Sequence, residues 1–371
     1  MVNSVVNPFL SLTAPGVAGL KPYEPGKPIE TLEREYGVRN AIKLASNENP
    51  LGPSPLALEA VIKTSAKLAL YPDGAGFVLK AALGRHLGVQ PEQVVLGNGS
   101  NEILELVTRT FVTPADEVVF SEHAFAVYPI VTQAVGATAR VAPARDYGHD
   151  LDAMAGLVNE NTRLVFVANP NNPTGTYLAR EALEAFITSM PSHVLVVLDE
   201  AYFEFVDAPD YPDGIAWLER FDNLLVTRTF SKIYGLAGLR VGYGVGHPKL
   251  ISLLERVRQP FNVNSAAMAA AEAALADHEH LRRSRAINAS GMAQLVAGIE
   301  ALGLHALPSV GNFLAVHVGR DAAPVYEALL RQGVIVRPVA GYGMPEFLRV
   351  TIGRPEENAR FLQALEAALN N

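Results

Sequence analysis

The sequence predicts an α/β protein whose main part is a doubly wound, mostly parallel sheet, accompanied by a smaller α/β domain. Short apolar runs of strand-like composition alternate along the chain with helical patterns, as a sheet covered on both faces requires. The 371 residues are enough for a large core and two domains. Since 49% of the residues are hydrophobic and only 18% are charged, we expect extensive burial, including a subunit interface.

The first third of the chain begins with an extended arm and continues with helices. Residues 22–28 are rich in Pro and Gly, which form poor helices and predict the arm. Amphipathic helices are expected over residues 55–70 and 77–87, the first ending where Pro72 disfavours further helix.

A strand, a turn and a helix follow, over residues 94–96, 97–101 and 102–110. This order places free backbone N–H groups at a helix start, where an anion can bind. A dinucleotide fingerprint would need a third glycine at the position of Glu102, so a dinucleotide site is disfavoured.

The remaining elements divide into two groups. Strands of the main sheet are expected over residues 118–120, 165–167, 194–198 and 224–227. A long helical stretch from 266 to about 302 ends near Gly303. The smaller domain is then indicated by strands over 313–316, 334–336 and 347–352, a helix over 324–330 and a terminal helix from 355.

Charge and cysteine content narrow the class of partner. The formal net charge of −8 disfavours nucleic acid, whose phosphates it would repel, whereas a few convergent arginines can still bind a phosphorylated substrate. Cysteine is absent and the nine histidines show no metal-ligand spacing, so no metal is expected. No charged start of a secretory signal precedes Lys21 and no apolar run is long enough for a membrane span, so we expect a cytoplasmic protein without a membrane partner.

Lys232 is the candidate nucleophile. It ends the segment Thr229-Phe230-Ser231-Lys232 and is followed by a glycine-rich stretch that contains Arg240. A neutral lysine amine forms a Schiff base with a carbonyl, and pyridoxal 5'-phosphate offers both an aldehyde and a phosphate. The hydroxyls and the arginine suit the phosphate.

Polar groups follow two of the expected strands. The strand over 194–198 ends in Asp199-Glu200-Ala201-Tyr202, and the strand over 165–167 runs into a turn rich in Asn, Pro and Gly. Ligands of open α/β sheets bind at the carboxyl ends of the strands, so we expect Asp199 at a binding site.

Four motifs stand in one order along the chain: Asn172-Pro173-Thr174-Gly175, Asp199-Glu200-Ala201-Tyr202, Ser231-Lys232 and Ala237-Gly238-Leu239-Arg240. Together they resemble the fold-type I, class II aminotransferases, a pyridoxal-phosphate-dependent family, and the resemblance extends from about Tyr23 to Gly353. The segments 45–50, 71–73 and 348–353 resemble its histidinol-phosphate aminotransferase branch. The resemblance implies three parts: residues 1–45 as an arm and part of the small domain, 46–265 as the large cofactor-binding domain, and 266–371 as a connecting helix and the rest of the small domain.

The resemblance also implies how the cofactor ring is held. Asp199 would keep the pyridine nitrogen protonated, so that the ring accepts electrons from the substrate α-carbon. Tyr202 and Asn172 would hydrogen-bond the 3-oxygen. Phe125 falls where the family stacks an aromatic on the ring, although an ordinary core aromatic is an equal reading of this residue.

For the phosphate, the resemblance implies Gly99, Ser100, Asn101, Thr229, Ser231 and Arg240. Tyr71 would add a phenol from the neighbouring subunit, which makes a homodimer part of the prediction. An ordinary aromatic at the end of a helix is the alternative for Tyr71.

Lys232 would both anchor the cofactor and move the proton between the substrate and cofactor carbons. Arg349 matches the family arginine that binds a substrate carboxylate, and Arg337 and Tyr23 are candidates for a substrate phosphate. Asn47 is expected to line the pocket. A solvated arginine at a strand edge is the alternative for Arg337.

The expected activity is transfer of the amino group of histidinol phosphate to 2-oxoglutarate by a ping-pong mechanism. Two alternatives stay open at this point. Relatives in this branch accept aromatic amino acids, and decarboxylases of phosphorylated amino acids share the fold and the cofactor site.

Overall fold

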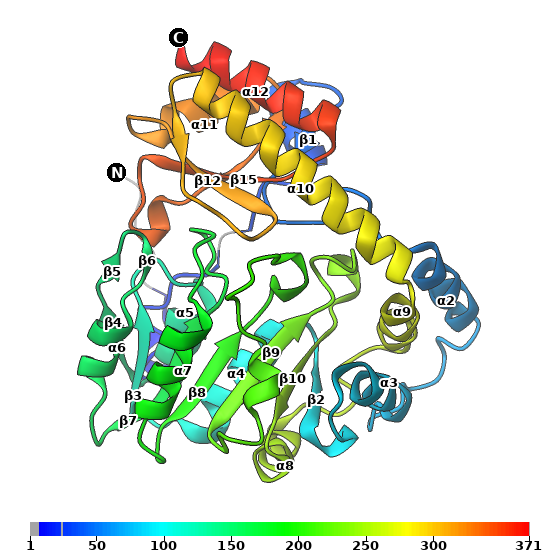
Figure 1. Cartoon of the computed structure of the whole chain (residues 1–371), viewed down its shortest axis with the longest axis vertical. Coiled ribbons are helices and arrows are strands. Elements are labelled where there is room, and N and C mark those ends of the chain that lie inside the picture. The colour runs from blue at the N-terminus through cyan, green and yellow to red at the C-terminus, as the bar shows by residue number, and fades with distance from the viewer. Residues whose placement is uncertain (1–6, 24, 371) are drawn as a thin grey trace.

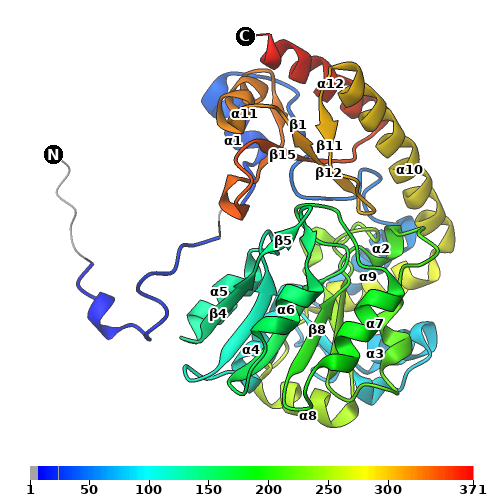
Figure 2. The same ribbon diagram turned by 60° about the vertical axis from the view of Figure 1, so that its left-hand side comes forward.

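A computed structural model describes residues 7–23 and 25–370. Residues 1–6, Asn371, and Glu24 within the expected arm lie outside the described residues. Figure 1 shows two layered parts, one around each of two sheets, with helix α10 (His278–Ala301) running along one side from the first part to the second. Figure 2 shows the described N-terminal segment that precedes the expected arm extending away from both parts.

The larger sheet is doubly wound and mostly parallel, as predicted. Its strand order is β2-β10-β9-β8-β7-β3-β4, and β10 alone among these seven runs antiparallel to its neighbours. The strands are β2 (Val94–Gly97), β3 (Glu117–Ser121), β4 (Thr138–Ala142), β7 (Thr162–Ala168), β8 (Leu195–Asp199), β9 (Leu224–Thr229) and β10 (Gly242–Gly246).

Helices cover both faces of this sheet, which explains why its central strands are apolar throughout. In β8, Val196 and Leu198 belong to one core cluster, while Leu195 and Val197 belong to the other. The first cluster is covered by α2 (Pro55–Ser65), α3 (Phe77–Leu87), α6 (Leu151–Leu157), α7 (Arg180–Ser189) and α9 (Ser265–Ala276). The second is covered by α4 (Ser100–Phe111), α5 (Val127–Ala134) and α8 (Pro248–Val257).

The smaller part is built on an antiparallel sheet of order β11-β12-β15-β14. Its elements are β11 (His305–Ala306), β12 (Phe313–His317), α11 (Ala322–Arg331), β14 (Arg337–Pro338), β15 (Phe347–Thr351) and α12 (Pro355–Leu369). Strand β1 (Ile42–Lys43) pairs in parallel with β13 (Val334–Ile335), so the N-terminal segment packs here. The boundaries at 45/46 and 265/266 stay a prediction, and we use the names large and small domain in that sense.

Short elements complete the described chain. They are α1 (Ile29–Tyr36), the hairpin strands β5 (Ala144–Arg145) and β6 (Gly148–His149), and 3-10 turns at Leu10–Leu12, Pro91–Gln93, Phe203–Phe205, Gly214–Trp217, Ala237–Leu239 and Ala340–Tyr342. None of the helices in the described ranges has the length and apolar character needed to cross a membrane.

Several expected boundaries differ from the structure by a few residues, as in β7, which was expected over 165–167 and begins at Thr162. Three of the differences have a physical reason in the packing or affect the site. The helix expected over 55–70 ends at Ser65, and beyond it Leu68 and Leu70 are exposed, so no core holds a further turn in place. The stretch expected from 266 to 302 breaks at Asp277, whose carboxylate caps α10 at the backbone N–H of His280 and accepts from Ser54 Oγ at 2.6 Å.

The third error concerns α4, which was expected from Glu102. The helix begins at Ser100, so Ser100 and Asn101 lie in its first turn rather than in the preceding loop. Their backbone N–H groups therefore belong to the helix terminus itself.

Candidate active site

A cavity of about 170 Å³ lies at the carboxyl ends of β7, β8 and β9, on the side that faces the small domain. Every predicted site residue except Gly99 and Tyr71 lines it. The lining residues are Tyr23, Gly26, Ala45, Ser46, Asn47, Ser100, Asn101, Phe125, Ala168, Pro170, Asn172, Asp199, Ala201, Tyr202, Thr229, Ser231, Lys232, Arg240, Arg337 and Arg349.

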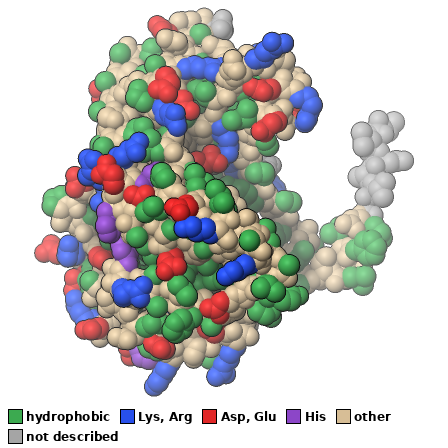
Figure 3. Space-filling view, turned by 90° about the vertical axis from the view of Figure 1, so that its right-hand side faces the viewer, with side chains coloured by type: hydrophobic (Ala, Val, Ile, Leu, Met, Phe, Trp, Pro, Cys, Tyr) green, Lys and Arg blue, Asp and Glu red, His purple; other side chains and the backbone are tan. Residues whose placement is uncertain are grey.

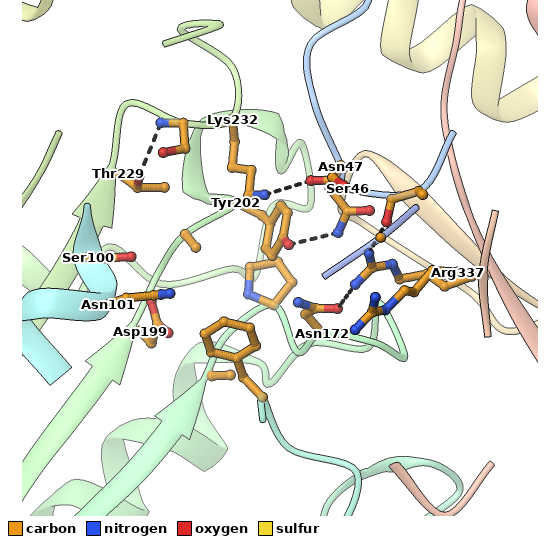
Figure 4. Close-up of a pocket in the computed structure, with 18 of the residues that line it drawn as sticks. Ser46, Asn47, Ser100, Asn101, Asn172, Asp199, Tyr202, Thr229, Lys232 and Arg337 are labelled. Carbon is orange, nitrogen blue, oxygen red and sulfur yellow. Dashed lines mark hydrogen bonds between the residues drawn. The ribbon is translucent and has the colours of Figure 1, made fainter. Parts of the chain in front are cut away.

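Lys232 points into this cavity (Figure 4). Its Nζ donates a hydrogen bond to the backbone carbonyl of Ser46 at 3.0 Å. Burial, followed by the nearby charge of Arg349, lowers the pKa of Lys232 to about 7. A large fraction of the amine is therefore neutral near pH 7, the form that attacks a carbonyl or accepts a proton.

Asp199, the last residue of β8, is held by two hydroxyl donors. Tyr128 Oη donates to Oδ2 at 2.9 Å and Thr227 Oγ1 donates to Oδ1 at 3.0 Å. Burial raises the pKa of Asp199, while these hydrogen bonds and the charge of Lys232 act in the opposite direction. A cationic group beside this carboxylate would be strongly stabilised.

Asn47 and Tyr202 are bonded to each other at the domain boundary. Asn47 Nδ2 donates to Tyr202 Oη at 2.8 Å, and the backbone N–H of Asn47 donates to Thr351 Oγ1 at 2.9 Å. Burial raises the pKa of Tyr202 to about 12, so this phenol keeps its proton and can donate a hydrogen bond into the cavity.

An anion cradle lies at the start of α4. Gly99, the residue before the helix, has φ +80°, and a Cβ there would collide with the guanidinium of Arg240. Arg240 Nη1 donates to Ser231 Oγ at 3.3 Å, and the backbone N–H of Ser231 donates to Thr229 Oγ1 at 3.1 Å. The free N–H groups of the helix start, the hydroxyls and the guanidinium together suit a phosphate.

The two predicted substrate arginines come from neighbouring strands of the small domain. Arg349 is 6% exposed, and it donates to Asn172 Oδ1 at 2.5 Å and to the carbonyl of Ala45. Its buried Nε has no hydrogen-bond partner among the described residues. Arg337 lies over the ring of Tyr23 at 5.4 Å. This side of the cavity is therefore suited to an anionic ligand.

Two predicted aromatic contacts lie differently. Phe125 lines the cavity and meets Tyr128 edge-on at 5.9 Å, so it contacts both the cavity and the core. Tyr71 is 83% exposed and stacks on Phe261 at 4.8 Å, away from the cavity of its own chain. Tyr71 is therefore not part of the cavity within a single chain.

Several site residues were missed by sequence reasoning. Ser46 was recognised only as a member of the segment 45–50. It accepts the hydrogen bond of Lys232 with its backbone carbonyl, and the side chain gives no sign of such a role. Tyr128, a hydroxyl on a mostly apolar helix, was the one visible signal for the Asp199 contact. Gly26, Ala45, Ala168, Pro170 and Ala201 line the cavity without carrying ionisable groups. Across residues 7–23 and 25–370, no group of three His, Asp or Glu side chains could hold a metal ion.

Comparisons with known proteins agree with this geometry. Residues 39–365 match the family described as aminotransferase class I and II. Histidinol-phosphate aminotransferase 1 of Nitrosococcus oceani is 59% identical to this chain, covering 97% of it and 98% of the relative. Histidinol-phosphate aminotransferase 2 of Pseudomonas aeruginosa is 61% identical with the same coverage. The crystal structure of histidinol-phosphate aminotransferase from Sinorhizobium meliloti in complex with pyridoxal-5'-phosphate superimposes with a TM-score of 0.90 at 31% identity, covering 97% of this chain and 98% of that one.

Proposed function

The chain belongs to the class I and II aminotransferases, and we propose that it moves the amino group of L-histidinol phosphate to 2-oxoglutarate. The products are imidazole-acetol phosphate and L-glutamate, and the reaction belongs to histidine biosynthesis in the cytoplasm. The observation that carries this proposal is one cavity that holds a buried lysine amine, a carboxylate at the end of β8 and two arginines from the small domain. The names of the most similar relatives support the choice of substrate.

The cofactor is pyridoxal 5'-phosphate, which when bound supplies a carbonyl for an amine and a ring that accepts electrons. The residues fit it. Gly99 has φ +80°, which favours glycine, and donors for a phosphate collect beside it. The amine of Lys232 lies across the same cavity. We assign the phosphate to Gly99, Ser100, Asn101, Thr229, Ser231 and Arg240, the ring nitrogen to Asp199, the ring face to Phe125 and the ring oxygen to Tyr202 and Asn172.

Lys232 Nζ is the proposed proton carrier. Its lowered pKa leaves it able to accept the α-proton of the substrate near pH 7 and to give that proton back at the neighbouring carbon. The carbonyl of Ser46 orients the amine. Asp199, which accepts hydrogen bonds from Tyr128 and Thr227, carries a negative charge on the side of the site opposite Lys232. This charge would keep the ring nitrogen of the cofactor protonated.

Arg349 and Arg337, with Tyr23 and Asn47, are the proposed substrate contacts. Histidinol phosphate carries a phosphate and no carboxylate, whereas 2-oxoglutarate carries two carboxylates. The same pair of guanidinium groups can bind either anion in turn, because each presents planar N–H donors to oxygen pairs. The two substrates therefore use the cavity one after the other, and ping-pong kinetics follow.

We also propose a homodimer in which Tyr71 reaches the phosphate site of the partner subunit. Three large side chains between α2 and the start of α3 are more than two-thirds exposed. They are Ile62 on α2, Tyr71 in the connection and Phe77 at the start of α3. Further apolar side chains are exposed on the N-terminal segment before the arm, where Figure 3 shows hydrophobic groups standing away from the body. These are Phe9 at 67% and Leu12 at 78% exposed. Apolar surface of this extent is characteristic of a subunit interface.

The test is kcat/KM for histidinol phosphate against phenylalanine, each with 2-oxoglutarate, measured as glutamate formation by the cofactor-loaded protein. We expect a preference for histidinol phosphate of about a hundredfold or more. Comparable values would instead make this an aminotransferase for aromatic amino acids. No glutamate from either donor would contradict transamination and favour decarboxylation.

A further inference from the structure

The hairpin of β5 and β6 lies at the boundary between the two domains. Figures 1 and 2 both place β5 at the edge of the large domain that faces the small domain. The turn of the hairpin is Asp146-Tyr147, and both residues have positive φ, 51° and 61°. Neither is glycine, so the surrounding contacts must hold this turn in its conformation.

The base of the hairpin is fixed to the large domain. His149 in β6 is half-buried, and its Nε2 bonds the carbonyl of Ala168, the last residue of β7, at 2.9 Å. The backbone N–H of Ala144 in β5 donates to Glu122 Oε2 at 3.2 Å. Tyr147 is therefore carried on a support that is tied to the same strand end that lines the cavity.

The ring of Tyr147 reaches across the boundary. It lies 5.6 Å from the ring of His123 in the large domain and meets the ring of Phe347 in β15 edge-on, with 5.1 Å between the ring centroids. Phe347 is 3% exposed and continues into the small-domain core with Val339 and Met344. A rigid hairpin of one domain thus contacts the core of the other.

Every second residue of β15, beginning with Phe347, contacts a residue outside the small-domain sheet. Side chains two apart on a strand leave from the same face, so Phe347, Arg349 and Thr351 share one face. Phe347 contacts Tyr147, Arg349 donates to Asn172, and Thr351 accepts from Asn47. The position of Phe347 therefore sets the position of Arg349, two residues along a short strand.

We propose that Tyr147 is a positioning residue. Its contact with Phe347 holds β15 in place, and with it fixes the position of Arg349 relative to Lys232. Tyr147 does not line the cavity, and its ring meets the small domain at Phe347. The inference rests on the proposed function in one respect, since it assigns the substrate carboxylate to Arg349. Misplacing such a group by about 1 Å lowers the rate by one to two orders of magnitude.

Tyr147→Ala tests this. The side chain is 37% exposed, so its removal leaves little buried space and the variant should fold. We expect kcat/KM for 2-oxoglutarate to fall about tenfold, mostly through KM, with the affinity for pyridoxal 5'-phosphate unchanged. Tyr147→Phe keeps the ring and should retain the activity. Tyr177→Ala is the matched control, because Tyr177 also lies in the large domain, where its ring contacts Tyr211 and its hydroxyl donates to Asp210.

A second readout does not depend on activity. The chain has no cysteine, so Glu181→Cys on α7 and Gln363→Cys on α12 introduce two exposed sites for spin labels, one in each domain. In Tyr147→Ala the distribution of distances between the labels should broaden or shift, and in Tyr147→Phe and Tyr177→Ala it should not. An unchanged distribution, or an unchanged kcat/KM in Tyr147→Ala, would overturn the proposal. If the unsubstituted enzyme did not transaminate, the proposed function would fail and the distances alone would decide the role of Tyr147.

Discussion

Arg337 and Arg349 stand directly opposite each other on the antiparallel strands β14 and β15, so both side chains leave the small-domain sheet on the side of the cavity. Two like charges at this spacing repel each other, and burial lowers the pKa of Arg349. Such a pair is stabilised when an anion lies between or beside the two guanidinium groups. The arrangement thus favours the binding of an anion at the cost of some stability of the folded protein without that anion.

Arg349→Lys should lower kcat/KM for 2-oxoglutarate by about a hundredfold, because an ammonium cannot replace the two-pronged contact of a guanidinium. Steady-state kinetics with glutamate formation measures this. Arg331→Lys, at an exposed ion pair on α11, is the control and should behave like the unsubstituted enzyme. Equal kinetics in Arg349→Lys would exclude Arg349 from the carboxylate site.

Arg337→Ala should reduce kcat/KM for histidinol phosphate by about tenfold or more, and less for phenylalanine, because only the first carries a phosphate. Both donors are compared with 2-oxoglutarate as the common acceptor. An unchanged preference between the two donors would return Arg337 to the alternative of a solvated arginine at a strand edge.

Lys232→Ala should abolish turnover, since no other amine lines the cavity among the described residues. The variant should still bind pyridoxal 5'-phosphate through the cradle around Gly99, but without the absorbance of cofactor bound covalently to lysine. Retained turnover would contradict the role assigned to Lys232.

The stability of the cofactor-free protein should also report on Lys232. Its pKa is about 7 in the folded protein against 10.5 ordinarily, so between these values the unfolded chain binds more protons and stability rises with pH. Lys232→Met removes this dependence. The advantage of Lys232→Met over the unsubstituted protein in unfolding free energy should therefore shrink by up to roughly 3 kcal/mol between pH 7 and pH 9.5. Urea unfolding at both pH values measures it, and an advantage that does not change with pH would argue against a buried amine with a lowered pKa.

Tyr71→Phe should weaken the binding of pyridoxal 5'-phosphate by about tenfold, because one hydrogen bond to a charged group is lost. Titration of the cofactor-free protein with pyridoxal 5'-phosphate measures the affinity. Tyr177→Phe is the control, because it loses a hydroxyl that bonds Asp210 and does not line the cavity. Unchanged affinity in Tyr71→Phe would mean that Tyr71 is an ordinary surface aromatic.

Much of this architecture was predictable because its signals are local. The apolar runs over 194–198 and 224–227 form β8 and β9, since a strand covered on both faces needs apolar residues throughout. The helix expected over 77–87 has those bounds. Asp199 was identifiable because it stands at the end of such a strand. Lys232 was identifiable because it ends a short motif that contains two hydroxyl residues.

The errors and omissions share one physical cause, which is contact between distant segments. The break at Asp277 depends on Ser54, and the end of α2 at Ser65 depends on the absence of a core beneath Leu68 and Leu70. Tyr128 could be assigned to Asp199 only when the helix that carries it was placed over β8. None of these contacts leaves a periodic pattern in the sequence.

The sequence by itself determined the α/β class, the order of the strands along the chain and the set of reactive side chains, because apolar periodicity and short motifs are properties of neighbouring residues. The tertiary structure decided which of those side chains meet. It brought Ser46 to Lys232 within the large domain, and it brought Asn172 to Arg349 and Tyr147 to Phe347 across the boundary between the two domains. The residue type determines which chemistry each group can perform. Its pKa and its partners depend on burial and on distances that only the packed fold sets.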